Sequence, residues 1–103
     1  MKLKDNYYNK NDFIKDVLKM ARYMKKEHKE RNAKHTLFYN KFVGIEWEYW
    51  KFTLYVNSEK VSTEAILFQD GKETKFPFTT WGDKYKRWDS DLKEFLMREI
   101  NKQ

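Results

Sequence analysis

Hydrophobic positions change phase within the segment 44–57, GIEWEYWKFTLYVN. Apolar residues occupy odd positions from Ile45 to Tyr49 and even positions from Trp50 to Val56. Successive side chains of a strand point to opposite faces, so the two sets lie on opposite sides of a sheet. One face can form the core, and the other carries aromatic residues that need a separate explanation.

This alternation and two turn signals predict a β-meander from about 42 to 78. Asp70-Gly71 is a strong signal for a two-residue hairpin, because glycine tolerates the positive φ of a type I′ turn. The earlier turn is interpreted as a four-residue loop at 57–60, NSEK. The two turns predict these cross-strand pairs: Gln69–Lys72, Leu67–Thr74, Ala65–Phe76, Val56–Val61, Leu54–Thr63, Phe52–Ala65 and Trp50–Leu67.

One face of the three predicted strands is nearly all apolar in these registers. It comprises Trp50, Phe52, Leu54, Val56, Val61, Thr63, Ala65, Leu67, Thr74, Phe76 and Phe78. A slip of one residue would move each set to the opposite face, so this agreement favours the apolar face as the core. Glu46 and Glu48 then point toward the core side, and we expect them to overhang the covered part of the sheet.

One helix is predicted before the meander in the sequence and one after it. The first spans about 12–34, with Asn11 as N-cap and an apolar arc along one side. The last spans about 91–102, where Asp91 and Glu94 can form a capping box after a break in the run Asp89-Ser90-Asp91. With a short strand expected around 36–39, the sequence predicts one α+β domain over 1–103. Its order is α-β-β-β-α, an antiparallel three-stranded β-meander packed by an N-terminal and a C-terminal helix.

Composition limits the classes of function. The chain has 103 residues and no cysteine, which excludes disulfides and thiolate metal sites, and we expect no metal and no cofactor. No apolar run approaches the roughly 20 residues that span a bilayer, and the N-terminus lacks the apolar region of a signal peptide. We therefore expect a cytoplasmic protein that does not contact a membrane.

The charge balance is basic, with 22 Lys and Arg against 16 Asp and Glu and a formal net charge of +6. Positive charge favours nucleic acid or an acidic protein surface as partner. A genome rich in A and T would also raise the lysine content without any functional demand. The small size and the lysine-rich, aromatic composition suit an accessory protein of a phage or mobile element.

Two groups of residues are candidates for binding. In the segment 79–89, aromatic residues alternate with cations: Trp81, Lys84, Tyr85, Lys86, Arg87 and Trp88. Such a run suits nucleic acid or an acidic partner, unless the segment is a connector whose tryptophans pack onto the sheet.

The second group lies on the sheet face opposite the predicted core and comprises Trp47, Tyr49, Lys51 and Lys75, with Phe68 beside them. It resembles a platform on which bases stack and lysines neutralise phosphates. Three alternatives remain open. A helix could cover this face as a second core layer, another protein could dock there, or a homodimer could form through it.

Catalytic signals are weak. His28 and His35 are expected to lie exposed at the end of the first helix, and no metal or nucleotide motif is present. The sequence therefore predicts a non-catalytic module that contacts nucleic acid. The alternative is a protein inhibitor of a host nucleic-acid-handling or defence protein. The second alternative is a small ribonuclease-type toxin acting through His28, His35 or Tyr85.

Overall fold

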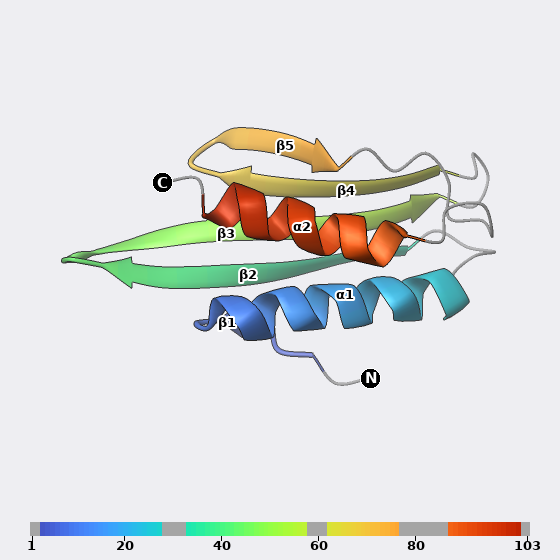
Figure 1. Cartoon of the computed structure of the whole chain (residues 1–103), viewed down its shortest axis with the longest axis horizontal. Helices are drawn as coiled ribbons and strands as arrows, with labels where there is room; N and C mark the ends of the chain where they lie inside the picture. The colour runs from blue at the N-terminus through green and yellow to red at the C-terminus, as the bar shows by residue number, and fades with distance from the viewer. Residues whose placement is uncertain (1–2, 28–32, 58–61, 77–86, 102–103) are drawn as a thin grey trace.

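The structure, a computed structural model, describes residues 3–27, 33–57, 62–76 and 87–101 (Figure 1). Within these ranges two helices accompany one five-stranded mixed sheet, so the chain has an α+β fold. The predicted sheet of three strands is wrong, because two further strands join it. The elements are β1 (Asn6–Tyr7), α1 (Lys10–Glu27), β2 (Ala33–Val43), β3 (Glu46–Asn57), β4 (Ser62–Gln69), β5 (Lys72–Phe76) and α2 (Trp88–Ile100).

The two additional strands, β1 and β2, extend the sheet from β3, at one edge of the predicted meander. The strand order is β1-β2-β3-β4-β5, and β1 runs parallel to β2 while the other neighbours are antiparallel. The short strand expected at 36–39 is the middle of an 11-residue strand. β2 joins β3 through a two-residue turn at Gly44-Ile45, where Gly44 has a φ of 64°. Glycine with positive φ at the first central position fits a type II′ hairpin.

The turn between β4 and β5 forms as predicted. Asp70 and Gly71 have φ values of 48° and 77°, which are the two positive values that a type I′ turn requires. All three predicted pairs are confirmed: Gln69–Lys72, Leu67–Thr74 and Ala65–Phe76.

The predicted register between β3 and β4 is wrong by two residues. The structure pairs Phe52 with Leu67, Leu54 with Ala65 and Val56 with Thr63. A slip of two residues leaves every side chain on its original face, so the facial pattern could not detect this error. Of the predicted turn at 57–60, Asn57 ends β3, and residues 58–60 lie outside the described ranges.

The first helix starts earlier than predicted. The side-chain oxygen Oδ1 of Asn9 accepts the backbone N–H groups of Asn11 and Asp12, at 2.9 and 3.1 Å. Asn9 is therefore the N-cap, and the prediction of Asn11 is wrong. The predicted extension to residue 34 is also wrong, because Ala33 begins β2.

The second helix also starts earlier, at Trp88, with Arg87 as an N-cap that makes no side-chain capping bond. The break and the capping box predicted at Asp91 are therefore wrong. Asp89 and Asp91 occupy the first turn, where their negative charges meet the positive end of the helix dipole. Burial of Trp88 packs this turn against the core and outweighs the weak helix propensity of Asp89-Ser90-Asp91.

The core lies between the sheet and both helices. Phe13 of α1 stacks on Tyr39 at 5.5 Å between ring centroids, and Tyr39 stacks on Trp50 at 5.1 Å. Phe95 of α2 meets Phe76 edge to face at 5.4 Å. Both contacts lie on the face of the even-numbered β3 residues, and Figure 1 shows α1 alongside β2 and α2 running over β3.

The predicted core face is confirmed for seven of its residues, while Thr74 is half-buried. The buried ones are Trp50, Phe52, Leu54, Val56, Ala65, Leu67 and Phe76. Val61 and Phe78 lie outside the described residues. Because both helices pack on one face, the opposite face of the sheet has no described helix above it.

Candidate binding face

The sheet face opposite the helices is called the open face below. The pairing places Phe38 beside Lys51, Asn40 beside Tyr49 and Phe42 beside Trp47. The remaining residues of the open face follow from the same registers: Lys34, Thr36, Thr53, Tyr55, Glu64, Ile66, Phe68, Glu73 and Lys75. The four sheet residues predicted for binding, Trp47, Tyr49, Lys51 and Lys75, are thus on one face.

Aromatic rings meet at one end of the open face. The Trp47 ring packs against Phe42, with 5.1 Å between centroids, and against Tyr8 edge to face at 5.8 Å. Trp47 and Tyr49 are 47% and 55% exposed, and Phe42 is 56% exposed. Contiguous exposed apolar surface of this kind marks interaction sites on proteins.

A cation lies among the aromatic rows. The Nζ atom of Lys51 lies 4.4 Å from the centroid of the Phe68 ring, a cation–π contact. Lys75 lies opposite Ile66, and Lys34 lies opposite Tyr55. These lysines share the face with Glu64 and Glu73, which partly offset their charge.

A hollow of about 340 Å³ lies on the same face. Its lining residues are Lys34, Lys51, Thr53, Tyr55, Glu64, Ile66 and Phe68. Thr53 is buried there, and its Oγ1 atom is 3.0 Å from Oγ1 of Thr36, which fixes both side chains. The open face therefore combines aromatic rings, cations and a hydrogen-bonded pair of threonine side chains.

The aromatic end of this face belongs to a projecting part of the sheet. β4 pairs with β3 only from Lys51 onward, so residues 40–50 form a two-stranded extension, here called the β2–β3 arm (Figure 1). On its helix side Glu46 is exposed, as the expected overhang requires, whereas Glu48 is half-buried and its Oε2 atom is shielded from solvent. Lys41 pairs across the strands with Glu48. The arm thus has one aromatic face and one charged face.

Two of the binding residues predicted in the segment 79–89, Arg87 and Trp88, lie within the described ranges. Trp88 is 6% exposed and packs in the core, with Nζ of Lys25 at 5.8 Å from its ring centroid. Arg87 is exposed at the start of α2. Trp81, Lys84, Tyr85 and Lys86 lie outside the described residues.

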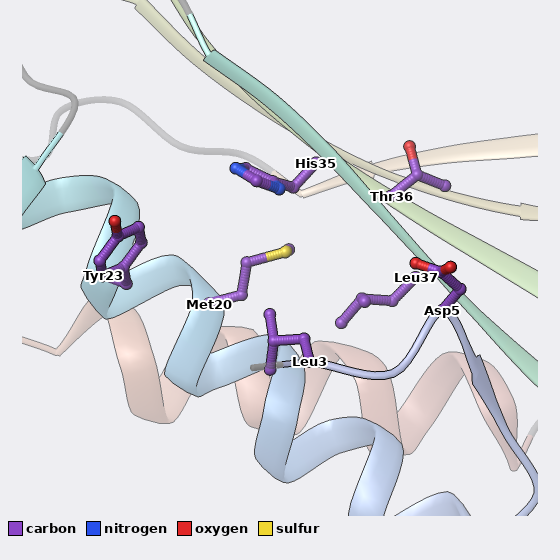
Figure 2. Close-up of a pocket in the computed structure, with 7 residues that line it drawn as sticks. All are labelled: Leu3, Asp5, Met20, Tyr23, His35, Thr36 and Leu37. Carbon is purple, nitrogen blue, oxygen red and sulfur yellow. The ribbon is translucent and has the colours of Figure 1, made fainter. Parts of the chain in front are cut away.

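His35 lies on β2, so its expected place at a helix end is wrong; His28 lies outside the described residues. His35 borders a pocket of about 430 Å³ between α1 and β2 (Figure 2). In Figure 2 the apolar side chains of Leu3 and Leu37 project into this pocket, while Thr36 points away. In the described part of the chain, no three His, Asp or Glu side chains form a cluster that could hold a metal ion.

Sequence reasoning missed three aromatic residues of the site: Tyr8, Phe38 and Phe42. The signal for the last two was present, since Gly44-Ile45 is a glycine-first two-residue hairpin turn. That turn alone would have placed Phe42 opposite Trp47 and Phe38 opposite Lys51. Tyr8 had no such signal, because its position depends on the parallel pairing of β1.

Neither described helix is long and apolar enough to cross a bilayer. Comparison with protein-family models, with curated proteins and with solved structures gave no match. The open face is therefore interpreted from its own geometry and chemistry.

Proposed function

We propose that this protein is a non-catalytic binding module that contacts nucleic acid through its open face. One observation carries the proposal: exposed aromatic rings and lysines share a sheet face that neither described helix covers. Bases stack on aromatic rings, and lysines neutralise the phosphate backbone. The basic charge of the whole chain favours the approach of a phosphate polymer.

Tryptophan fluorescence offers a direct test. Trp47 is the exposed tryptophan of the described residues, whereas Trp50 and Trp88 are buried. Titration with short single- and double-stranded DNA and RNA is expected to quench this fluorescence. The absence of both quenching and binding, with the protein shown to be folded by circular dichroism, would contradict the proposal.

Charge-matched variants localise the contact. Lys51→Gln and Lys75→Gln are expected to weaken binding, because each removes a cation from the open face. Lys15→Gln is the control, since Lys15 is exposed on α1, which packs on the other face of the sheet. An equal loss in all three variants would indicate a general charge effect and would count against this face.

A protein partner is the second candidate, and the β2–β3 arm favours it. The aromatic side of the arm has few charges at its centre, which is typical of the buried middle of protein interfaces. Trp and Tyr are also the usual energetic anchors there. A folded protein that binds no oligonucleotide, but loses a co-purifying protein on Trp47→Ala, would favour this candidate.

A further inference from the structure

We infer that the nucleic acid bound at the open face is single-stranded; this inference rests on the proposed function. The first reason is width. Five strands spaced about 4.8 Å apart extend about 19 Å across the sheet. The major groove of a duplex is only about 12 Å wide, so this face cannot enter it. The bases of a duplex are stacked inside the helix, so only unpaired bases can lie on Trp47 and Tyr49.

The second reason concerns the β2–β3 arm. A two-stranded ribbon is narrow enough for a major groove, and the arm is the part of the described sheet with that width. Its helix side carries Glu46 and Glu48 against one cation, Lys41. Two carboxylates are repelled by the phosphates that flank a groove, so the arm is unsuited to duplex entry.

The third reason is the number of cations. In the described part of the sheet, the open face offers Lys34, Lys51 and Lys75, one from each of three strands, and Glu64 and Glu73 lie among them. Duplex-binding proteins commonly make about 6–10 phosphate contacts. The three lysines of the described face do not provide that number, so stacking is expected to supply most of the affinity.

The geometry assigns roles within this site. Trp47 and Tyr49 are two residues apart on β3, about 6.7 Å along the strand, and both rings are accessible to bases. Phe42 and Tyr8 contact the Trp47 ring and fix its position. Lys51 lies two residues beyond Tyr49 on β3, and its ammonium group can contact the phosphate backbone of the bound oligonucleotide. Sheet platforms of this size hold two or three bases.

Fluorescence anisotropy with labelled oligonucleotides tests the inference. The probes are short strands of thymidine or uridine and a duplex of the same length, at about 50 and about 200 mM salt. Tighter binding of either single strand than of the duplex, by about 10-fold or more, is expected. Three phosphate contacts limit the loss of affinity over this salt range to about 20-fold.

Substitutions in the ring pair separate stacking from general apolar contact. Trp47→Leu and Tyr49→Leu are each expected to lower single-strand affinity about 10-fold, because leucine keeps bulk but removes the ring. Trp47→Phe keeps a ring and is expected to retain most of the affinity. Tyr23→Leu on α1 is the control, and circular dichroism checks that every variant is folded.

The outcomes distinguish this inference from the proposed function. Equal binding of duplex and single strand, a steeper salt dependence, or unaffected leucine variants would overturn the single-strand inference and leave nucleic-acid binding in place. A folded protein that binds none of the probes would overturn both.

Discussion

At the scale of single residues, Tyr7 connects the parallel strand β1 to α1. Its hydroxyl group donates a hydrogen bond to Oδ2 of Asp16 at 2.7 Å and accepts one from the backbone N–H of Lys4 at 3.3 Å. Its ring meets Phe13 edge to face. Burial, followed by the hydrogen bond to Asp16 and the negative charge of Asp16, raises the pKa of Tyr7 to about 12.

This raised pKa predicts a loss of stability at alkaline pH. In the unfolded chain Tyr7 ionises near its ordinary pKa of 10, so between about pH 10 and 12 the folded state holds the proton more tightly. This stabilisation, about 3 kcal/mol, is fully present below pH 10 and is lost as pH rises through 12. We expect Tyr7→Phe to show a smaller alkaline decline in urea unfolding. Parallel declines for both proteins would contradict this role.

Trp88 and Trp47 predict losses of stability of different size for the same substitution. Trp88→Ala is expected to lower the free energy of unfolding by about 3–5 kcal/mol, because it leaves a cavity in the core. Trp47→Ala is expected to cost far less, since nearly half of that side chain is already exposed. The midpoints of urea unfolding measure both values. Similar midpoints for the two variants would show that Trp88 is not a core residue in solution.

At the scale of elements, the sequence predicts faces better than registers or ends. The period of two in β3 identifies Phe52 and Leu54 as core residues, because burying apolar surface is the dominant favourable term in folding. The β3–β4 register escapes this reasoning, since a slip of two residues buries the same side chains. Only the middle of β2, residues 36–39, was predicted as a strand, because only two of its core-side residues, Leu37 and Tyr39, are buried.

The two helix N-termini predict a contrasting pair of cap effects. Asn9 satisfies two backbone N–H groups of α1, so Asn9→Ala is expected to destabilise the protein by about 1 kcal/mol. Arg87 caps α2 without any side-chain bond, so Arg87→Ser is expected to stabilise it by up to about 1 kcal/mol. Thermal unfolding of both variants measures these changes. If Arg87→Ser destabilises the protein instead, the arginine makes a contact that stabilises the fold more than a serine N-cap would.

The range of the interactions explains which residues of the candidate site were predicted from the sequence and which were not. Alternation along one strand places Trp47, Tyr49 and Lys51 on one face without knowledge of any partner strand. Phe42 joins them through the local β2–β3 hairpin, whose turn signal is present in the sequence, whereas Tyr8 joins them only through the position of β1, which is a long-range contact. Short-range patterns identify strands joined by a tight turn, but they carry no information on which strand distant in the sequence becomes a neighbour, as β1 does beside β2.

At the scale of the whole molecule, both helices cover one side of the sheet. The sequence leaves open whether one helix would cover each face. The structure resolves this through the amount of apolar surface on each side. On the helix side of β3, Trp50, Phe52 and Leu54 form a continuous row of apolar side chains. On the open side, Lys51 and Thr53 interrupt the apolar row. Covering the continuous side twice removes more apolar area from water.

This one-sided architecture predicts a gradient of amide hydrogen exchange along β3. Residues 51–56 pair with strands on both sides and lie under the helices, so their exchange is expected to approach the rate set by global unfolding. Residues 46–49 pair with β2 alone in the arm and are expected to exchange through local opening at lower free energy. Exchange measured residue by residue by NMR gives both values.

Adding a single-stranded oligonucleotide is expected to slow exchange at 46–49 selectively, because an oligonucleotide stacked on Trp47 and Tyr49 opposes local opening of the β2–β3 arm. Uniform protection along β3, with or without the oligonucleotide, would show that the arm is not a separate opening unit.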